Sequence, residues 1–93
     1  MTVYKYQLPG TLNSLYLPAG AKPLTARFQD STFGNGFMLW CLVDTDEPVK
    51  ETREFVVVAT GAEIVYPENT NALEYISSIE TPQGLMFHVF EIV

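Results

Sequence analysis

The sequence has few of the residues that usually build chemical sites. It contains one cysteine and one histidine in 93 residues. A single cysteine cannot form a disulfide within the chain, which suits a reducing compartment. Zinc sites draw mainly on cysteine and histidine; a metal site with His88 would need carboxylate partners, since Cys41 is the one thiol.

Positive charge and long apolar runs are also scarce. Five basic residues stand against eleven acidic ones, giving a net charge of −6. Five scattered cations are too few for a long nucleic acid, which commonly needs about six or more phosphate contacts.

The longest apolar run, Phe37–Val43, spans 7 residues, whereas a membrane helix needs about 20. We therefore expect neither long nucleic acid nor membrane as a partner.

The remaining composition is that of a folded domain. Hydrophobic residues make up 47% and charged residues 17% of the chain. Disordered chains have the opposite balance, poor in apolar residues and rich in charge. The length fits one domain with a small core, so we expect a single β domain over residues 1–93.

Turn-forming residues recur at short intervals and leave little room for helices of ordinary length. This spacing predicts an all-β fold, a small antiparallel sandwich or partly closed barrel of about six to eight strands. The expected strands are Val3–Leu8, Leu12–Leu17, Pro23–Gln29, Phe37–Val43, Thr52–Thr60, a short Glu63–Tyr66, and a hairpin of Glu74–Glu80 with Leu85–Val93.

Side chains alternate along several of these segments. In the third strand, Leu24, Ala26 and Phe28 are expected in the core, and Thr25, Arg27 and Gln29 outside. Two strands, Phe37–Val43 and Leu85–Val93, are apolar on both faces. A strand of that kind is covered on both sides, by a short helix or by another subunit, so we expect a homo-oligomer.

Motifs for catalysis are missing. His88 lies in an apolar strand and is interpreted as a hydrogen-bonded strand histidine, with a general base in a small hydrolase as the alternative. Cys41 is interpreted as a buried small hydrophobic residue. Asp44-Thr45-Asp46 begins like a calcium loop but lacks the later glycine and glutamate. The sequence thus predicts no catalytic residue, no cofactor and no metal.

Aromatic residues next to cations give the strongest hint of binding. Aromatic rings stack on flat ring systems, and arginine pairs with phosphate through two hydrogen bonds. We expect Arg53 and Lys5 to hold phosphate, with Tyr4, Tyr6 and Trp40 stacking, in a pocket between subunits. For Arg53 the alternative is a salt bridge at the rim of the fold, to Asp44, Asp46 or Glu91.

A series of short phrases resembles a family of short proteins encoded by bacteriophages and prophages and catalogued as a domain of unknown function. The phrases occur in the family's order over nearly the whole chain: Tyr4-Lys5-Tyr6, Pro18-Ala19-Gly20-Ala21, Leu39-Trp40-Cys41-Leu42-Val43-Asp44, Arg53-Glu54-Phe55, Thr60-Gly61, Tyr75-Ile76, Gly84-Leu85 and His88-Val89-Phe90-Glu91. The resemblance implies expression in the cytoplasm of an infected bacterial host.

Three hypotheses on function follow. The first is a phage protein that sequesters a small anionic molecule, such as a cyclic nucleotide signal of host antiviral defence. The second is an accessory protein that binds a host or phage protein through β edges and exposed aromatics. The third is a small hydrolase using His88.

Overall fold

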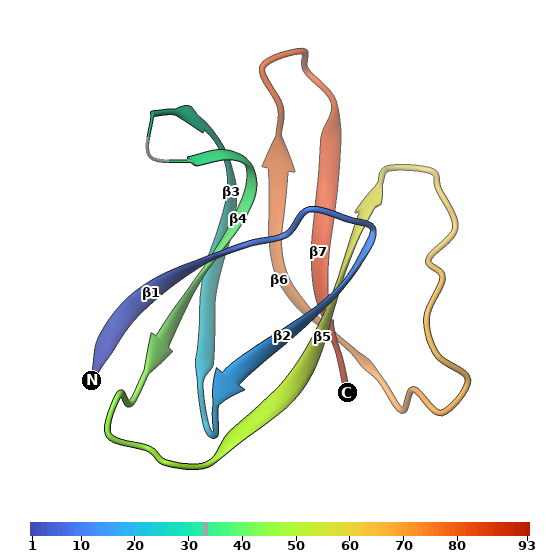
Figure 1. Ribbon diagram of the computed structural model, residues 1–93. Helices are drawn as coiled ribbons and strands as arrows, with labels where there is room; N and C mark the ends of the chain where they lie inside the picture. The colour runs from blue at the N-terminus through green and yellow to red at the C-terminus, as the bar shows by residue number, and fades with distance from the viewer. Residues whose placement is uncertain (33) are drawn as a thin grey trace.

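The computed structural model describes residues 1–32 and 34–93, and these form seven strands and no helix (Figure 1). The strands are β1 (Thr2–Gln7), β2 (Leu12–Pro18), β3 (Lys22–Ser31), β4 (Gly34–Val43), β5 (Lys50–Ala59), β6 (Leu73–Glu80) and β7 (Met86–Ile92). The predicted all-β class is confirmed, and so is the closing hairpin, now β6 and β7.

The strands form two antiparallel sheets that pack as a sandwich and do not close into a barrel. Sheet A has the order β1-β4-β3, and sheet B has the order β2-β5-β7-β6. The sheets meet along β3 and β6, where Ser77 Oγ donates a hydrogen bond of 2.9 Å to the Ala26 carbonyl oxygen. On the opposite side, β1 is an edge strand with β4 as its one neighbour in sheet A (Figure 1).

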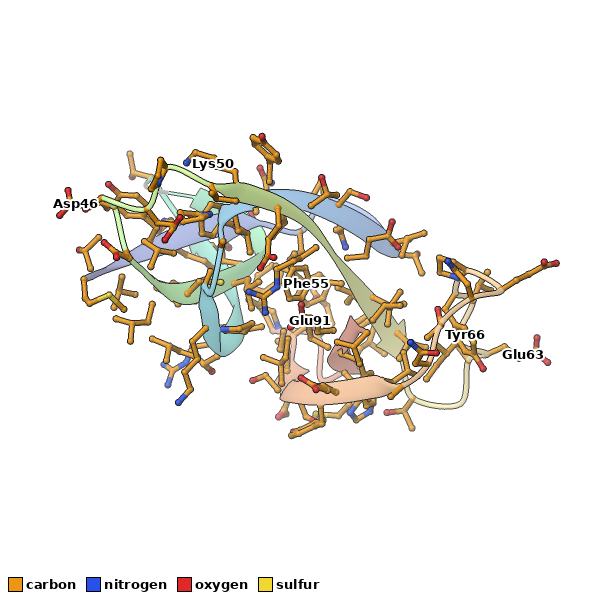
Figure 2. The ribbon with its side chains drawn as sticks, turned by 90° about the horizontal axis from the view of Figure 1, so that it is seen from below. Asp46, Lys50, Phe55, Glu63, Tyr66 and Glu91 are labelled. Carbon is orange, nitrogen blue, oxygen red and sulfur yellow. The ribbon has the colours of Figure 1, made fainter. Side chains whose placement is uncertain are left out.

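The core lies between the sheets and follows the predicted alternation. Residues at every second position of β4 and β5 point inward and are buried, as are matching positions on β2 and β7, because side chains in a strand alternate between its two faces. Phe55 lies near the middle of the molecule (Figure 2). The inward core residues of these four strands are Leu17, Leu39, Cys41, Val43, Phe55, Val57 and Val89.

Two details of the prediction are wrong. Leu24 is 45% exposed instead of buried, because a β-bulge between Pro23 and Thr25 shifts the register at this point. Glu63–Tyr66 forms no strand. Both sides of β5 are already paired, to β2 and β7, and after Gly61 the chain leaves the sheet as an outlying loop (Figure 2).

Candidate functional site

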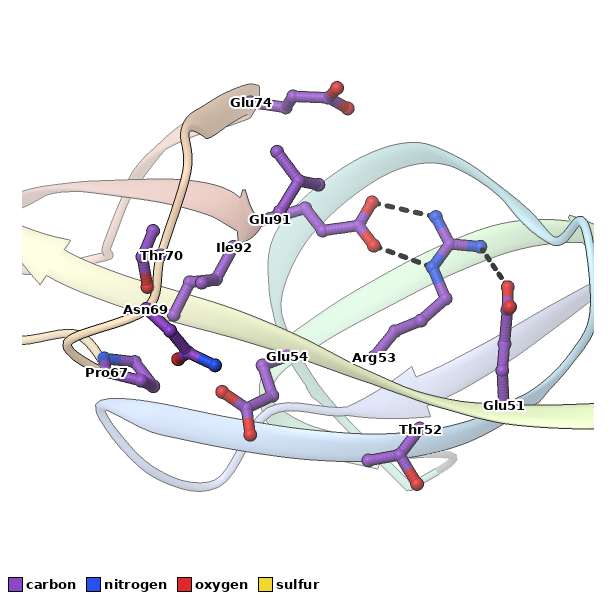
Figure 3. A pocket seen from close by; sticks show the side chains of 11 residues that line it. Glu51, Thr52, Arg53, Glu54, Pro67, Asn69, Thr70, Glu74, Glu91 and Ile92 are labelled. Atoms are coloured by element: carbon purple, nitrogen blue, oxygen red, sulfur yellow. Dashed lines mark hydrogen bonds and ion pairs between the residues drawn. The ribbon is translucent and has the colours of Figure 1, made fainter.

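Arg53 lies on the inward side of β5 and is held by a nearly buried carboxylate. Its Nε and Nη2 donate hydrogen bonds of 2.6 and 2.7 Å to the two carboxylate oxygens of Glu91 on β7. Its Nη1 donates to the Ala21 carbonyl oxygen. The same nitrogen lies 3.7 Å from a carboxylate oxygen of Glu51 (Figure 3). The hydrogen bonds that Arg53 donates to the Glu91 carboxylate raise the pKa of Arg53. This is one of the rim salt bridges that the sequence offered as the alternative to a ligand contact.

The hollow next to Arg53 is acidic. It encloses about 700 Å³ and is lined by Arg53 together with Glu51, Glu54, Glu74 and Glu91 (Figure 3). Four carboxylates around one cation that is already paired give the hollow a negative potential, which opposes the entry of an anion. A phosphate ligand is therefore better accommodated elsewhere.

Lys5 and Trp40 lie side by side on the outward face of sheet A. They are directly opposite each other in the β1–β4 register, and they point outward because Leu39 and Cys41 point into the core. The Leu8 amide donates to the Phe37 carbonyl oxygen at 2.9 Å. Leu8 and Phe37 are therefore a hydrogen-bonded pair. Hydrogen-bonded and non-hydrogen-bonded pairs alternate along an antiparallel ladder, so Lys5 and Trp40, three positions away, are a non-hydrogen-bonded pair. Side chains come closest in pairs of this second kind.

A second cation and a shallow apolar hollow adjoin this pair. Arg27 on β3 points outward opposite Met38, and it lines a hollow of about 310 Å³ with Trp40, Val3, Leu24 and Thr25. We call the outward side of sheet A, with Lys5, Lys22, Arg27 and Trp40, the basic face. It carries three of the five basic residues, and the described outward positions of its strands include no carboxylate.

The Lys5 ammonium is positioned by close contacts. Its Nζ donates a 2.9 Å hydrogen bond to Gln29 Oε1 on β3. A Cβ on Gly34 would lie 2.9 Å from Met38 Cε, 3.0 Å from Gln29 Oε1 and 3.2 Å from Lys5 Nζ. Only glycine lets the backbone come so close, so Gly34 allows the Lys5–Gln29 contact to form.

The two tyrosines predicted to stack lie on the other side of β1. Tyr4 and Tyr6 point the same way as Cys41 and Leu39, their partners on β4. Tyr6 packs against the core, and burial raises its pKa, while Tyr4 is half exposed. Of the five predicted contacts, the chain thus brings Lys5 and Trp40 together and leaves Tyr4, Tyr6 and Arg53 on the inward side.

Sequence reasoning missed Arg27 as a site residue. Its outward position was visible in the alternation of β3, and that prediction is confirmed. What the sequence does not show is that β1 and β3 flank the same strand, β4. This pairing puts Arg27 on the same face as Lys5.

His88 is hydrogen-bonded on both ring nitrogens, as the interpretation of a strand histidine requires. Nε2 lies 2.7 Å from Thr60 Oγ1, and Nδ1 lies 2.8 Å from Ser78 Oγ. The Tyr75 hydroxyl lies 2.9 Å from the same Ser78 oxygen. The ring thus has hydroxyl groups on both sides, in contrast to a Ser-His-Asp triad, where a carboxylate orients the histidine.

The remaining candidates for chemistry have structural roles. Asp44 Oδ1 accepts the Asp46 amide at 3.0 Å in an ordinary turn. Burial raises the pKa of the Cys41 thiol to about 11, so the thiol is protonated near neutral pH. Across residues 1–32 and 34–93, no three metal-ligating side chains come together, and no helix could cross a membrane.

The fold and the basic face define a small antiparallel β-sandwich domain with a cationic, aromatic surface on one sheet. A family model described as "Domain of unknown function (DUF7352)" matches residues 1–93, and the chain belongs to that family. No curated protein and no solved structure matches the chain.

Proposed function

We propose that this chain is a bacteriophage-encoded binding protein that sequesters a small anionic ligand with a flat ring. The observation that carries the proposal is the Lys5–Trp40 pair, directly opposed on adjacent strands and joined by Arg27 on the same open face. The ligand class is the cyclic nucleotides that signal host antiviral defence. The resemblance of the ordered phrases to phage and prophage proteins supports this context and a place in the host cytoplasm.

The chemistry of the basic face suits such a ligand. Stacking of a base on an aromatic ring contributes about 1–3 kcal/mol, which Trp40 supplies. Lys5 and Arg27 supply charge for one or two phosphates, and arginine adds paired hydrogen bonds. The acidic residues elsewhere, which give the chain its net charge of −6, oppose the binding of a long polyanion. The face therefore favours a small ligand over a nucleic acid strand.

Calorimetric titration with cyclic di-AMP, cyclic di-GMP and ADP-ribose tests the proposal. Lys5→Ala, Arg27→Ala and Trp40→Leu should each weaken binding about tenfold or more, because each removes a direct contact. Lys50→Ala is the matched control. It removes the same charge from an exposed residue at the start of β5, away from the basic face, and should bind like the wild type. A wild-type chain that binds no member of the panel overturns the proposal.

A second candidate function is a phage accessory protein that binds a protein partner. Exposed aromatic residues on the outer side of sheet B favour it: Tyr16 and Tyr75 are 69% and 62% exposed. Aromatic residues are enriched at protein interfaces. Tyr16→Ser with Tyr75→Ser should abolish capture of a host or phage protein while leaving nucleotide binding unchanged, and the reverse pattern excludes this function.

A further inference from the structure

Two cations of the basic face lie on the same side of Trp40. Arg27 on β3 is directly opposite Met38, the outward residue of β4 that precedes Trp40. The Lys5 side chain starts opposite Trp40 and reaches across β4 to β3, where Nζ donates its 2.9 Å hydrogen bond to Gln29. Gln29 is the next outward residue of β3 after Arg27. The Lys5 ammonium and Arg27 therefore both lie toward Met38.

The other side of Trp40 is apolar. Val3 on β1 pairs with Leu42, the outward residue of β4 that follows Trp40. Val3 and Leu24 line the hollow of about 310 Å³ next to Trp40, and they are 49% and 45% exposed. Trp40 thus has apolar side chains in one direction along the face and cations in the other.

The β-bulge in β3 accounts for the place of Leu24. The bulge lies between Pro23 and Thr25, and without it the alternation of β3 would direct Leu24 into the core. Bulges are common next to functional sites, where they re-aim a side chain. This bulge adds an aliphatic wall to the hollow beside Trp40.

Past the cations, the described residues of the face offer no second aromatic ring. The outward positions there carry Gln7, Gln29 and Gly36. The nearby Phe28 and Phe37 are opposite each other on β3 and β4, and both pack against the core. The order along the face is therefore apolar hollow, tryptophan, cations and amides.

We propose that each chain holds a nucleotide by a single base, which stacks on Trp40 in the hollow while its phosphate lies between Arg27 and Lys5. The ligand class is then the nucleotides with one base, such as cyclic mononucleotides. The second half of a cyclic dinucleotide stays outside the site. This inference rests on the proposed function and deepens it, because it names which cyclic nucleotides the face holds completely.

The size and the layout of the face support a single base. Ligand pockets usually measure about 300–1,000 Å³, and the hollow, at about 310 Å³, is at the lower end of that range. A cyclic dinucleotide has its two bases on either side of its two phosphates, so complete recognition needs a ring on both sides of the cations. Trp40 is the one tryptophan of the chain, and Tyr4 and Tyr6 point to the inward side.

Calorimetric titration with matched ligands tests the number of bases. Cyclic AMP is compared with cyclic di-AMP, and cyclic GMP with cyclic di-GMP. One molecule of each should bind per chain. The members of a pair should differ by less than about threefold, since a base without a contact adds only the statistical advantage of two equal halves, about twofold. A dinucleotide that binds more than about fivefold tighter than its mononucleotide, or that binds as one molecule per two chains, overturns the inference.

The fluorescence of Trp40 reports where the base lies. Because the chain has one tryptophan, stacking should quench its emission to the same extent with a mononucleotide and with the matching dinucleotide. Binding without a change in this emission overturns the stacking on Trp40.

Leu24→Ala tests the wall of the hollow. The chain should remain folded, since Leu24 is exposed, but loss of the apolar contact with the base should weaken the binding of cyclic AMP about threefold to tenfold. Leu12→Ala is the matched control. Leu12 is 47% exposed and lies on β2 of the other sheet, so this variant should bind like the wild type. Equal affinities of the two variants overturn the contact between Leu24 and the base.

The outcomes separate this inference from the function on which it rests. Binding of the cyclic dinucleotides without binding of cyclic AMP or cyclic GMP overturns the single base and leaves the proposed function standing. A chain that binds none of these ligands and no ADP-ribose removes the proposed function, and the single base with it.

Discussion

Arg53 on β5 and Glu91 on β7 form a two-point ion pair that also anchors the turn before β3. The two hydrogen bonds measure 2.6 and 2.7 Å, and the side chains are 18% and 7% exposed. Because Arg53 Nη1 also donates to the Ala21 carbonyl oxygen, one guanidinium connects three segments of the chain. An isolated surface pair contributes at most about 1 kcal/mol, but this pair is largely shielded from water.

Arg53→Ala should therefore change stability more than binding. The substitution leaves the Glu91 carboxylate nearly buried without its partner, which costs about 2 kcal/mol. Urea unfolding measures the loss, and titration with a cyclic dinucleotide should give an affinity within about twofold of the wild type. Intact stability together with a tenfold loss of binding would instead make Arg53 a direct ligand contact, the role that the sequence predicts.

Gly34→Ala should weaken both the fold and the ligand site. The added Cβ would lie 2.9 Å from Met38 Cε and 3.2 Å from Lys5 Nζ, so the Lys5–Gln29 contact must move. We expect a loss of about 1–2 kcal/mol in stability and a severalfold weaker titration with cyclic di-GMP. Gly10→Ala is the control, because its nearest contact would be an ordinary 3.5 Å. Equal behaviour of the two variants contradicts the positioning role of Gly34.

The strands were predictable because their signals are local. Alternation along β3 and β5 and turn residues between segments follow from two-residue periodicity. The bulge at Pro23 and Thr25 was not predictable, because it arises from pairing with β4. The same limit applies to the site. Lys5 and Trp40 were selected as an aromatic–cation pattern, but their direct opposition and the addition of Arg27 depend on which strands become neighbours.

Cys41 should be unreactive in the folded chain near neutral pH. Burial raises its pKa to about 11, above the value of about 8.5 for an exposed thiol. The folded state therefore favours the protonated thiol. This contribution to stability is complete below about pH 8.5, and it is lost as the pH rises through the folded pKa. Iodoacetamide at pH 8 should modify Cys41 only after unfolding, when the thiol becomes accessible.

The pH dependence has a direct control. Urea unfolding of the wild type between pH 8.5 and 11 should show a decline in stability that Cys41→Ala lacks. Other groups that titrate in this range act on both proteins, so the difference between the two curves isolates the thiol. Parallel curves would show that Cys41 is solvated in the folded state.

Ser77 and Ser78 are neighbours on β6 whose hydroxyl groups serve different contacts. Ser77 Oγ donates a 2.9 Å hydrogen bond to the Ala26 carbonyl oxygen and so joins β6 of sheet B to β3 of sheet A. Ser78 Oγ lies on the outer side of sheet B, exposed, beside His88 and Tyr75.

Ser77→Ala leaves a part-buried carbonyl without this donor, so it should cost about 1–2 kcal/mol in the free energy of unfolding. Ser78→Ala, at an exposed position, should cost less than about 0.5 kcal/mol. Urea unfolding of the two variants makes the comparison. A larger loss for Ser78→Ala would mean that the His88 cluster, rather than the β3–β6 contact, holds this part of the sandwich together.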